Sequence, residues 1–267
     1  MIKRLFNRND NIAILIAGIF SIIIGLGVAR FAFTGLIPAM LDDYLTIKFV
    51  GILASLNFAG YLSGSIFSIF VKDINFKVYL YRFGIFLAIS TTFILAYSDN
   101  NTLWMVGRVL AGFAGAMCLI VGTSIVMQKL TIKSKTKAMG IHFSGIGFSI
   151  LTTDLLARFV LSLNYSWRDS WAVLALFAII LSLYSVYILS FDKEVKQNAV
   201  KVKFDISIFT PFVIVLIIAY FTEGVGFVVQ ATFLPDIINN LKGLEGYGSL
   251  TWTLVGVAGI PSCIIWM

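Results

Sequence analysis

Eight long apolar segments limit this chain to a fold that crosses a membrane. They cover about residues 12–40, 50–71, 78–97, 102–128, 138–161, 171–190, 209–235 and 249–267. A helix that crosses a bilayer needs about 20 apolar residues. Backbone groups in lipid must pair within the chain, and a continuous apolar run achieves this as a helix. We therefore predict an all-α polytopic membrane protein.

Composition excludes several other classes of protein. Apolar residues make up 59% of the 267 residues and charged residues 12%, with a mean hydropathy of +0.96, whereas soluble domains carry about 25% charged residues. A soluble enzyme, a disordered chain and a nucleic-acid-binding protein are excluded, because the net charge of +7 is concentrated in alternate loops. The bilayer is the one large partner that the sequence requires, and no signal favours a particular oligomeric state.

The basic residues predict the orientation. Fourteen fall at the end of the helices where the N-terminus lies: Lys3, Arg4, Arg8, Lys72, Lys77, Arg82, Lys129, Lys133, Lys135, Lys137, Lys193, Lys196, Lys201 and Lys203. The opposite end has only Lys48, Arg158, Arg168 and Lys242. Because cytoplasmic loops carry the excess of lysine and arginine, we predict a cytoplasmic N-terminus. Four tryptophans near the opposite ends are expected to form an aromatic belt: Trp104, Trp167, Trp171 and Trp252.

A weak internal repeat predicts two bundles of helices. FTGLIPAM around Pro38 resembles QATFLPDI around Pro235, and a Gly-x-Gly precedes each. The alternative is that glycine and proline are simply frequent in membrane helices. The longest polar stretch follows the sixth apolar segment. We therefore predict a six-helix half at 1–190, a cytoplasmic loop at 191–208, and the first two helices of a second half at 209–267.

Several motifs strengthen this interpretation. WMVGRVLAGFAGA at 104–116 places an arginine before a glycine series, and Ser-Trp-Arg at 166–168 precedes the sixth segment. GVARFAFT at 27–34, EGVGF at 223–227 and ATFLP at 231–235 complete the pattern. The chain resembles the major facilitator superfamily, and most closely its YbfB/YjiJ branch. The resemblance implies a secondary transporter of the bacterial inner membrane that moves a small solute by alternating access between two six-helix halves.

Two departures accompany the resemblance. The loop motif between the second and third helices is diluted in residues 64–84, where Lys72, Asp73, Lys77 and Arg82 remain. The superfamily has twelve helices, and about eight are present here. We therefore expect either a partial record of a longer transporter or a truncated remnant that does not transport.

Charged side chains inside the apolar segments are the candidate site residues, because a charge at membrane depth normally faces a partner or a wet cavity. We expect the cavity for an anionic or polar solute to be lined by Arg30, Thr34, Arg108, Glu223 and Gln230. At 100° per residue, Gly27, Arg30 and Thr34 share a face. Glycines on these faces are expected to allow close helix packing: Gly27, Gly112, Gly115, Gly147 and Gly226.

Alternatives remain for several of these residues. Arg108 is either a solute contact or a strut that bonds backbone carbonyls between helices. Asp154 and Arg158, four residues apart, are either an intrahelical ion pair or a solute contact. Proton coupling is a hypothesis that rests on Glu223 and Asp154, because an apolar cavity favours the neutral form of a carboxyl group. We expect Glu223 to face Arg30, Arg108 and Asp154 from the second half.

No signature of an enzyme is present. The sequence lacks Gly-x-Ser-x-Gly, His-Glu-x-x-His and a phosphate-binding Gly-x-x-x-x-Gly-Lys-Ser/Thr loop. Its single histidine, His142, excludes an imidazole metal cluster, so we expect no metal and no cofactor. A membrane enzyme that uses His142 is the remaining rival, and a histidine satisfied near the interface is the favoured interpretation.

Overall fold

The computed structural model describes residues 2–41, 43–131, 135–190 and 208–266. Within these ranges every regular element is a helix, which confirms the predicted all-α class. Seven helical stretches are long and apolar enough to cross a membrane: Asn11–Leu41, Ile47–Phe70, Ile74–Tyr97, Asn101–Lys129, Lys135–Ser162, Trp167–Ile188 and Pro211–Gln230. An eighth apolar helix, Leu250–Ile265, is shorter. The predicted central loop, apart from its last residue, lies outside the described residues.

The helices subdivide some of these stretches. The first consists of α2 (Asn11–Ile22), the π-helix η1 (Ile23–Phe31) and α3 (Ala32–Leu41). The fourth consists of α6 (Asn101–Ala116), the π-helix η2 (Met117–Val121) and α7 (Gly122–Lys129). The remaining helices are α1 (Ile2–Leu5), α4 (Ile47–Phe70), α5 (Ile74–Tyr97), α8 (Lys135–Phe143), α9 (Gly145–Ser162), α10 (Trp167–Ile188), α11 (Pro211–Asn239) and α12 (Gly248–Ile265).

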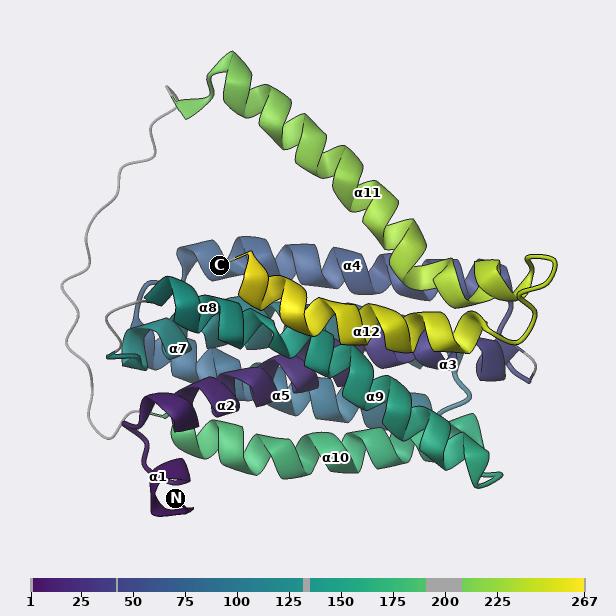
Figure 1. Ribbon diagram of the computed structural model, residues 1–267, viewed down its shortest axis with the longest axis horizontal. Coiled ribbons are helices and arrows are strands. Elements are labelled where there is room, and N and C mark those ends of the chain that lie inside the picture. Colours follow the sequence, from purple (N-terminus) through teal and green to yellow (C-terminus); the bar gives the residue numbers. More distant parts are fainter. Residues whose placement is uncertain (1, 42, 132–134, 191–207, 267) are drawn as a thin grey trace.

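The bundle is elongated, and all helices except α11 run roughly along its length (Figure 1). The buried core includes most of the first stretch, in which 78% of the most apolar 18-residue window is buried. Helix α11 leans away, so that none of residues 211–230 is buried. Its last part returns to the bundle, where Thr232 is only 4% exposed and Phe233 approaches Gly51 of α4.

Side chains cap the starts of several spans. The Asp73 carboxylate accepts the backbone N–H of Phe76 at 2.7 Å, and Asn100 Oδ1 accepts the N–H of Thr102 at 2.9 Å. Ser166 and Asp169 cap α10 reciprocally. Each cap satisfies a donor that the helix itself leaves unpaired, so the polar residues between the apolar segments define where the helices begin.

The two π-helices lie against each other. A Cβ on Gly25 of η1 would lie 2.3 Å from Cys118 Cβ of η2, so only glycine permits this approach. Ser21 Oγ donates to the Cys118 carbonyl at 2.9 Å. A wider turn disrupts the regular ladder of helix hydrogen bonds. In lipid the protein itself must then supply the missing donor, which Ser21 does here.

Glycines lie at the closest contacts between helices. A Cβ on Gly112 of α6 would lie 1.9 Å from the Asn57 carbonyl oxygen of α4, and one on Gly147 of α9 would lie 2.4 Å from the Ile260 nitrogen of α12. Gly27 approaches Ser149, and Gly115 approaches the Gly25 carbonyl. Gly226 differs, because no described atom lies within 4 Å of its Cβ position; it lies on the exposed part of α11.

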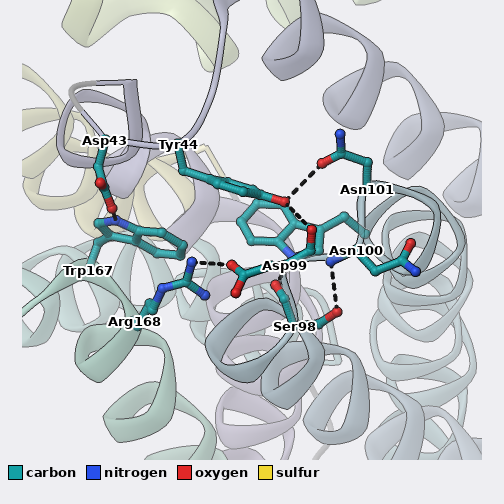
Figure 2. Close-up of polar contacts among 9 residues, drawn as sticks. Asp43, Tyr44, Ser98, Asp99, Asn100, Asn101, Trp167 and Arg168 are labelled. Carbon is teal, nitrogen blue, oxygen red and sulfur yellow. Dashed lines mark hydrogen bonds and ion pairs between the residues drawn. The ribbon is translucent and has the colours of Figure 1, made fainter.

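A polar and aromatic cluster joins three loops at the end of the bundle opposite α1 (Figure 2). The Tyr44 hydroxyl donates to the Asp99 carbonyl at 2.8 Å. Trp167 Nε1 donates to Asp43 at 2.9 Å, and Arg168 forms an ion pair with Asp99. Burial raises the pKa of the Tyr44 hydroxyl, and the Asp99 carboxylate adds to this effect. The cluster therefore fastens the α3–α4, α5–α6 and α9–α10 connections together.

The prediction of an aromatic belt is wrong for the four tryptophans. Trp104 and Trp171 are fully buried, and Trp252 and Trp167 are 2% and 4% exposed. Trp104 packs edge-on against Trp167 at 5.9 Å and tilted against Tyr44 at 5.2 Å. These rings hold helices and loops together inside the bundle and do not face lipid headgroups.

We expect Gly112→Ala to lower the free energy of unfolding by at least about 3 kcal/mol, the upper end for overpacking, because the new methyl group meets backbone. Gly107→Ala on the same helix is the matched control, since its Cβ would have only ordinary contact with Ile94. The control should be neutral or more stable by up to about 1 kcal/mol, from helix propensity. Thermal unfolding in detergent measures both, and equal stability of the two variants would contradict the close packing described here.

Candidate functional site

Arg30 projects from η1 and is half-buried. Its guanidinium carbon lies 4.1 Å from the centre of the Phe58 ring, 5.3 Å from that of Tyr61 and 5.5 Å from that of Phe31. Among the described residues, no carboxylate or carbonyl pairs with this guanidinium. Aromatic faces stabilise a cation only modestly, by about 0.5–2 kcal/mol. Arg30 is therefore a charge held in place by rings, with its hydrogen-bonding capacity unused.

Arg108 of α6 has a different environment. It is 2% exposed and donates from Nη1 to the Ala29 carbonyl at 3.0 Å and from Nε to the Leu53 carbonyl at 3.4 Å. Its guanidinium also lies 4.3 Å from the centre of the Phe33 ring. These bonds join η1, α4 and α6, which is the strut alternative given above. Its predicted role as a solute contact stays a prediction.

Asn57 of α4 is a site residue that the sequence analysis missed. It is 1% exposed, and its Nδ2 donates to the Arg108 carbonyl at 3.0 Å. Because that partner is an acceptor, the orientation of the amide is fixed, and Oδ1 is left without a partner among the described residues. An unsatisfied buried acceptor costs about 1–3 kcal/mol. The available signal was a lone asparagine inside an apolar segment.

These side chains surround a small cleft, here called the polar cleft. Its volume is about 20 Å³, which is room for about one water molecule. Thr34 lines it together with the two arginines, and Thr232 lines it from α11. The lining residues are Arg30, Phe31, Phe33, Thr34, Ala54, Asn57, Phe58, Arg108 and Thr232. None of these described residues carries a negative charge.

Two larger apolar spaces adjoin the polar cleft. The first, the tryptophan cavity, has a volume of about 280 Å³ and lies between η1, α9, α11 and α12. Its walls include Phe31, Ile150, Phe227, Gln230 and Trp252. The second, the α11 groove, has a volume of about 490 Å³ and runs between Arg30 and α11. Phe31 lines the cleft and the cavity, and Arg30 lines the cleft and the groove.

Asp154 lies between α9 and α12. Arg158 Nε approaches its Oδ2 at 3.0 Å, and Thr253 Oγ1 of α12 donates to the same oxygen. The side chain is only 2% exposed, whereas that of Arg158 is 27% exposed. The intrahelical pair is therefore present in the structure. The hydroxyl contact also links the fifth membrane stretch to the eighth apolar helix.

The structure does not bring Glu223 to Arg30. Glu223 is exposed on the part of α11 that leans away, in a shallow space lined by Ala219 and Tyr220. In the described part of the chain it has no ion-pair or hydrogen-bond partner. Gln230, about two turns farther along α11, lines the tryptophan cavity. The predicted cavity residues thus lie in three places. Arg30, Thr34 and Arg108 line the polar cleft, Gln230 lines the tryptophan cavity, and Glu223 lies outside both.

His142 is fully buried inside the bundle. Its Nε2 is 2.9 Å from Thr123 Oγ1, and Nδ1 has no partner among the described residues. It therefore contacts none of the residues around the polar cleft. No group of three histidine, cysteine, aspartate or glutamate side chains suited to a metal occurs in the residues that the structure describes.

A bundle of membrane-spanning helices that encloses charged groups beside apolar cavities has the architecture of a membrane transport protein. The sequence profile of the family described as "Uncharacterised MFS-type transporter YbfB" matches residues 22–267. The chain belongs to this family of the major facilitator superfamily, which consists of transporters and not of enzymes. The resemblance found in the sequence is thereby confirmed.

We expect the two arginines to differ in their effect on stability. Arg108→Met removes the two bonds from the guanidinium to the Ala29 and Leu53 carbonyls and should lower the free energy of unfolding by about 2 kcal/mol or more. That corresponds to roughly 5 °C in a chain of this size. Arg30→Met removes ring contacts and an unpaired charge together, and should change stability by less than about 1 kcal/mol. Thermal unfolding in detergent compares them, and a larger loss in Arg30→Met would show that Arg30 is the structural residue.

Proposed function

We propose that the protein is a secondary transporter that moves a small anionic solute across the bacterial inner membrane by alternating access. The single observation that carries the proposal is the position of Arg30. Its unpaired guanidinium lines both the polar cleft and the α11 groove. A membrane-embedded cation without a fixed partner favours a ligand that supplies the negative charge. The cytoplasmic N-terminus and the two-half organisation belong to the same proposal.

The fixed surroundings of Arg30 support this role. Phe58 and Tyr61 hold the guanidinium from α4, and Arg108 fastens α4 to η1 through its two carbonyl bonds. A binding group that is already positioned loses little conformational freedom when a ligand arrives. The wall opposite comes from α11, which packs tightly on the bundle only near Thr232. A movement of α11 would thus change access to Arg30 without disturbing the strut.

We expect Arg30→Gln to abolish the binding of anions. In a thermal-stability screen of the full chain, at least one small carboxylate should stabilise the wild type. At 100 times its Kd it would contribute about 2.7 kcal/mol, or roughly 5–10 °C. Arg82→Gln is the matched control, because Arg82 is exposed on α5 and lies outside the polar cleft. It should bind as the wild type does. Equal stabilisation of Arg30→Gln would contradict the assignment.

Proton coupling is the finer part of the proposal, and Asp154 and Glu223 are its candidates. Protonation of Asp154 would remove the charge that attracts Arg158 and would change the bond to Thr253, so a proton there alters the α9–α12 contact. Glu223 has no charged neighbour among the described residues, and its role depends on solute reaching α11.

We expect Asp154→Asn to separate transport from the proton gradient. In proteoliposomes the variant should still exchange solute at equal concentrations, but a pH jump should no longer drive accumulation. Glu223→Gln provides the parallel test of the second candidate. Either variant that keeps full proton-driven accumulation loses its assigned role, and the retained exchange shows that the protein is still folded.

A further inference from the structure

The polar cleft has one feature that an anion-binding arginine does not explain, namely a buried acceptor to which no group in the described part of the chain donates. Asn57 Oδ1 cannot turn toward Arg108, because its own Nδ2 holds the Arg108 carbonyl at 3.0 Å. A carboxylate brings only acceptors when ionised, so it pairs with Arg30 and leaves Oδ1 unsatisfied. The cleft therefore suits a ligand that presents an anion and a donor side by side.

On the basis of the proposed function, we propose that the solute is a 2-hydroxy carboxylate with an apolar body. The carboxylate binds the Arg30 guanidinium at the mouth of the polar cleft. The hydroxyl at the neighbouring carbon enters the cleft and donates to Asn57 Oδ1. The cleft of about 20 Å³ admits one water-sized group, which fits a hydroxyl and excludes the carboxylate itself.

Charge selects the hydroxyl over an ammonium group. Arg30 and Arg108 both line the cleft, and none of its described lining residues is acidic. An ammonium group there would be a third cation beside these two, and no carboxylate among the described lining residues would offset it. A keto group fails for a different reason, since it offers a second acceptor to an acceptor. Of the simple groups at the carbon beside the acid, the hydroxyl is the one that satisfies Asn57.

The surroundings of the cleft determine the rest of the solute. The tryptophan cavity is walled by Phe31, Ile150, Phe227 and Trp252, and the α11 groove by Phe58 and further apolar side chains. If the carboxylate of the solute binds Arg30, the rest of the solute contacts apolar side chains whether it extends into the tryptophan cavity or into the α11 groove. The cavity of about 280 Å³ is near the lower end of the range for small-molecule sites, so a single ring or a short branched chain is the expected size.

The test uses four ligands that differ only at the carbon beside the acid: 3-phenyllactate, 3-phenylpropionate, phenylpyruvate and phenylalanine. Binding to the purified full chain in detergent is measured by calorimetry. We expect 3-phenyllactate to bind at least tenfold more tightly than each of the other three. This comparison needs no variant, so it stands even where a substitution impairs folding.

Asn57→Leu then tests the named atom. It should reduce the preference for 3-phenyllactate over 3-phenylpropionate to less than threefold, with the affinity for 3-phenylpropionate changed by less than threefold. Asn75→Leu is the matched control, because Asn75 is exposed at the start of α5, and it should keep the wild-type preference. A preference that persists in Asn57→Leu would overturn the role of Oδ1 and indicate that ordered water satisfies it.

The remaining outcomes separate this inference from the proposed function. Equal binding of the four ligands, lost in Arg30→Gln, would overturn the hydroxyl requirement and leave the anion site intact. If other carboxylates bind and none of these four does, both the hydroxyl requirement and the apolar body of the proposed solute are overturned. The absence of binding by any carboxylate would overturn both proposals.

Discussion

The structure depends on the need of every backbone carbonyl inside a membrane to find a donor within the protein. Two wide helical turns, η1 and η2, disturb the regular ladder in the middle of the bundle. Ser21 reaches the Cys118 carbonyl in η2, and Arg108 reaches the Ala29 carbonyl in η1. These two bonds fix the first and fourth membrane stretches relative to each other, and the bond from Arg108 to the Leu53 carbonyl adds α4. The geometry around Arg30 and Asn57 follows from them, because both side chains project from the helices that Arg108 connects.

The same constraint explains why two arginines about one cleft have different tasks. The Arg108 guanidinium donates to carbonyl oxygens instead of to water, and these bonds hold helices together. The Arg30 guanidinium lies against aromatic rings, which attract a cation but do not replace the hydrogen bonds of a carbonyl or carboxylate. Burying a charge without such bonds is unfavourable. The anion of the proposed solute would supply the hydrogen-bond acceptors that Arg30 lacks among the described residues and would offset that penalty.

The sequence predicted the helices well, because hydropathy over about 20 residues has few alternative explanations. The sequence predicted less well which side chains share one face of a helix. Gly27 and Arg30 share a face at 100° per residue, but in the structure Gly27 packs on Ser149 of α9 while Arg30 lies on Phe58 of α4. Both lie in η1, whose wider turns rotate successive side chains by less. No periodicity in the sequence indicates where a π-helix occurs, and an uncharged asparagine such as Asn57 does not mark a position inside an apolar segment as strongly as a charge does.

Helices α9 and α12 meet through backbone. Gly147 faces the stretch from Gly256 to Ile260, and Gly256 in turn lies against Leu151, at distances that leave no room for a side chain. Where the side chains of two helices interdigitate, the helices can tilt relative to each other only if those side chains repack. The crossing of α9 and α12 at Gly147 is instead a contact of backbone with backbone, so the spacing of the two helices is set there by the absence of side chains, and the Thr253–Asp154 bond joins the same helices farther along.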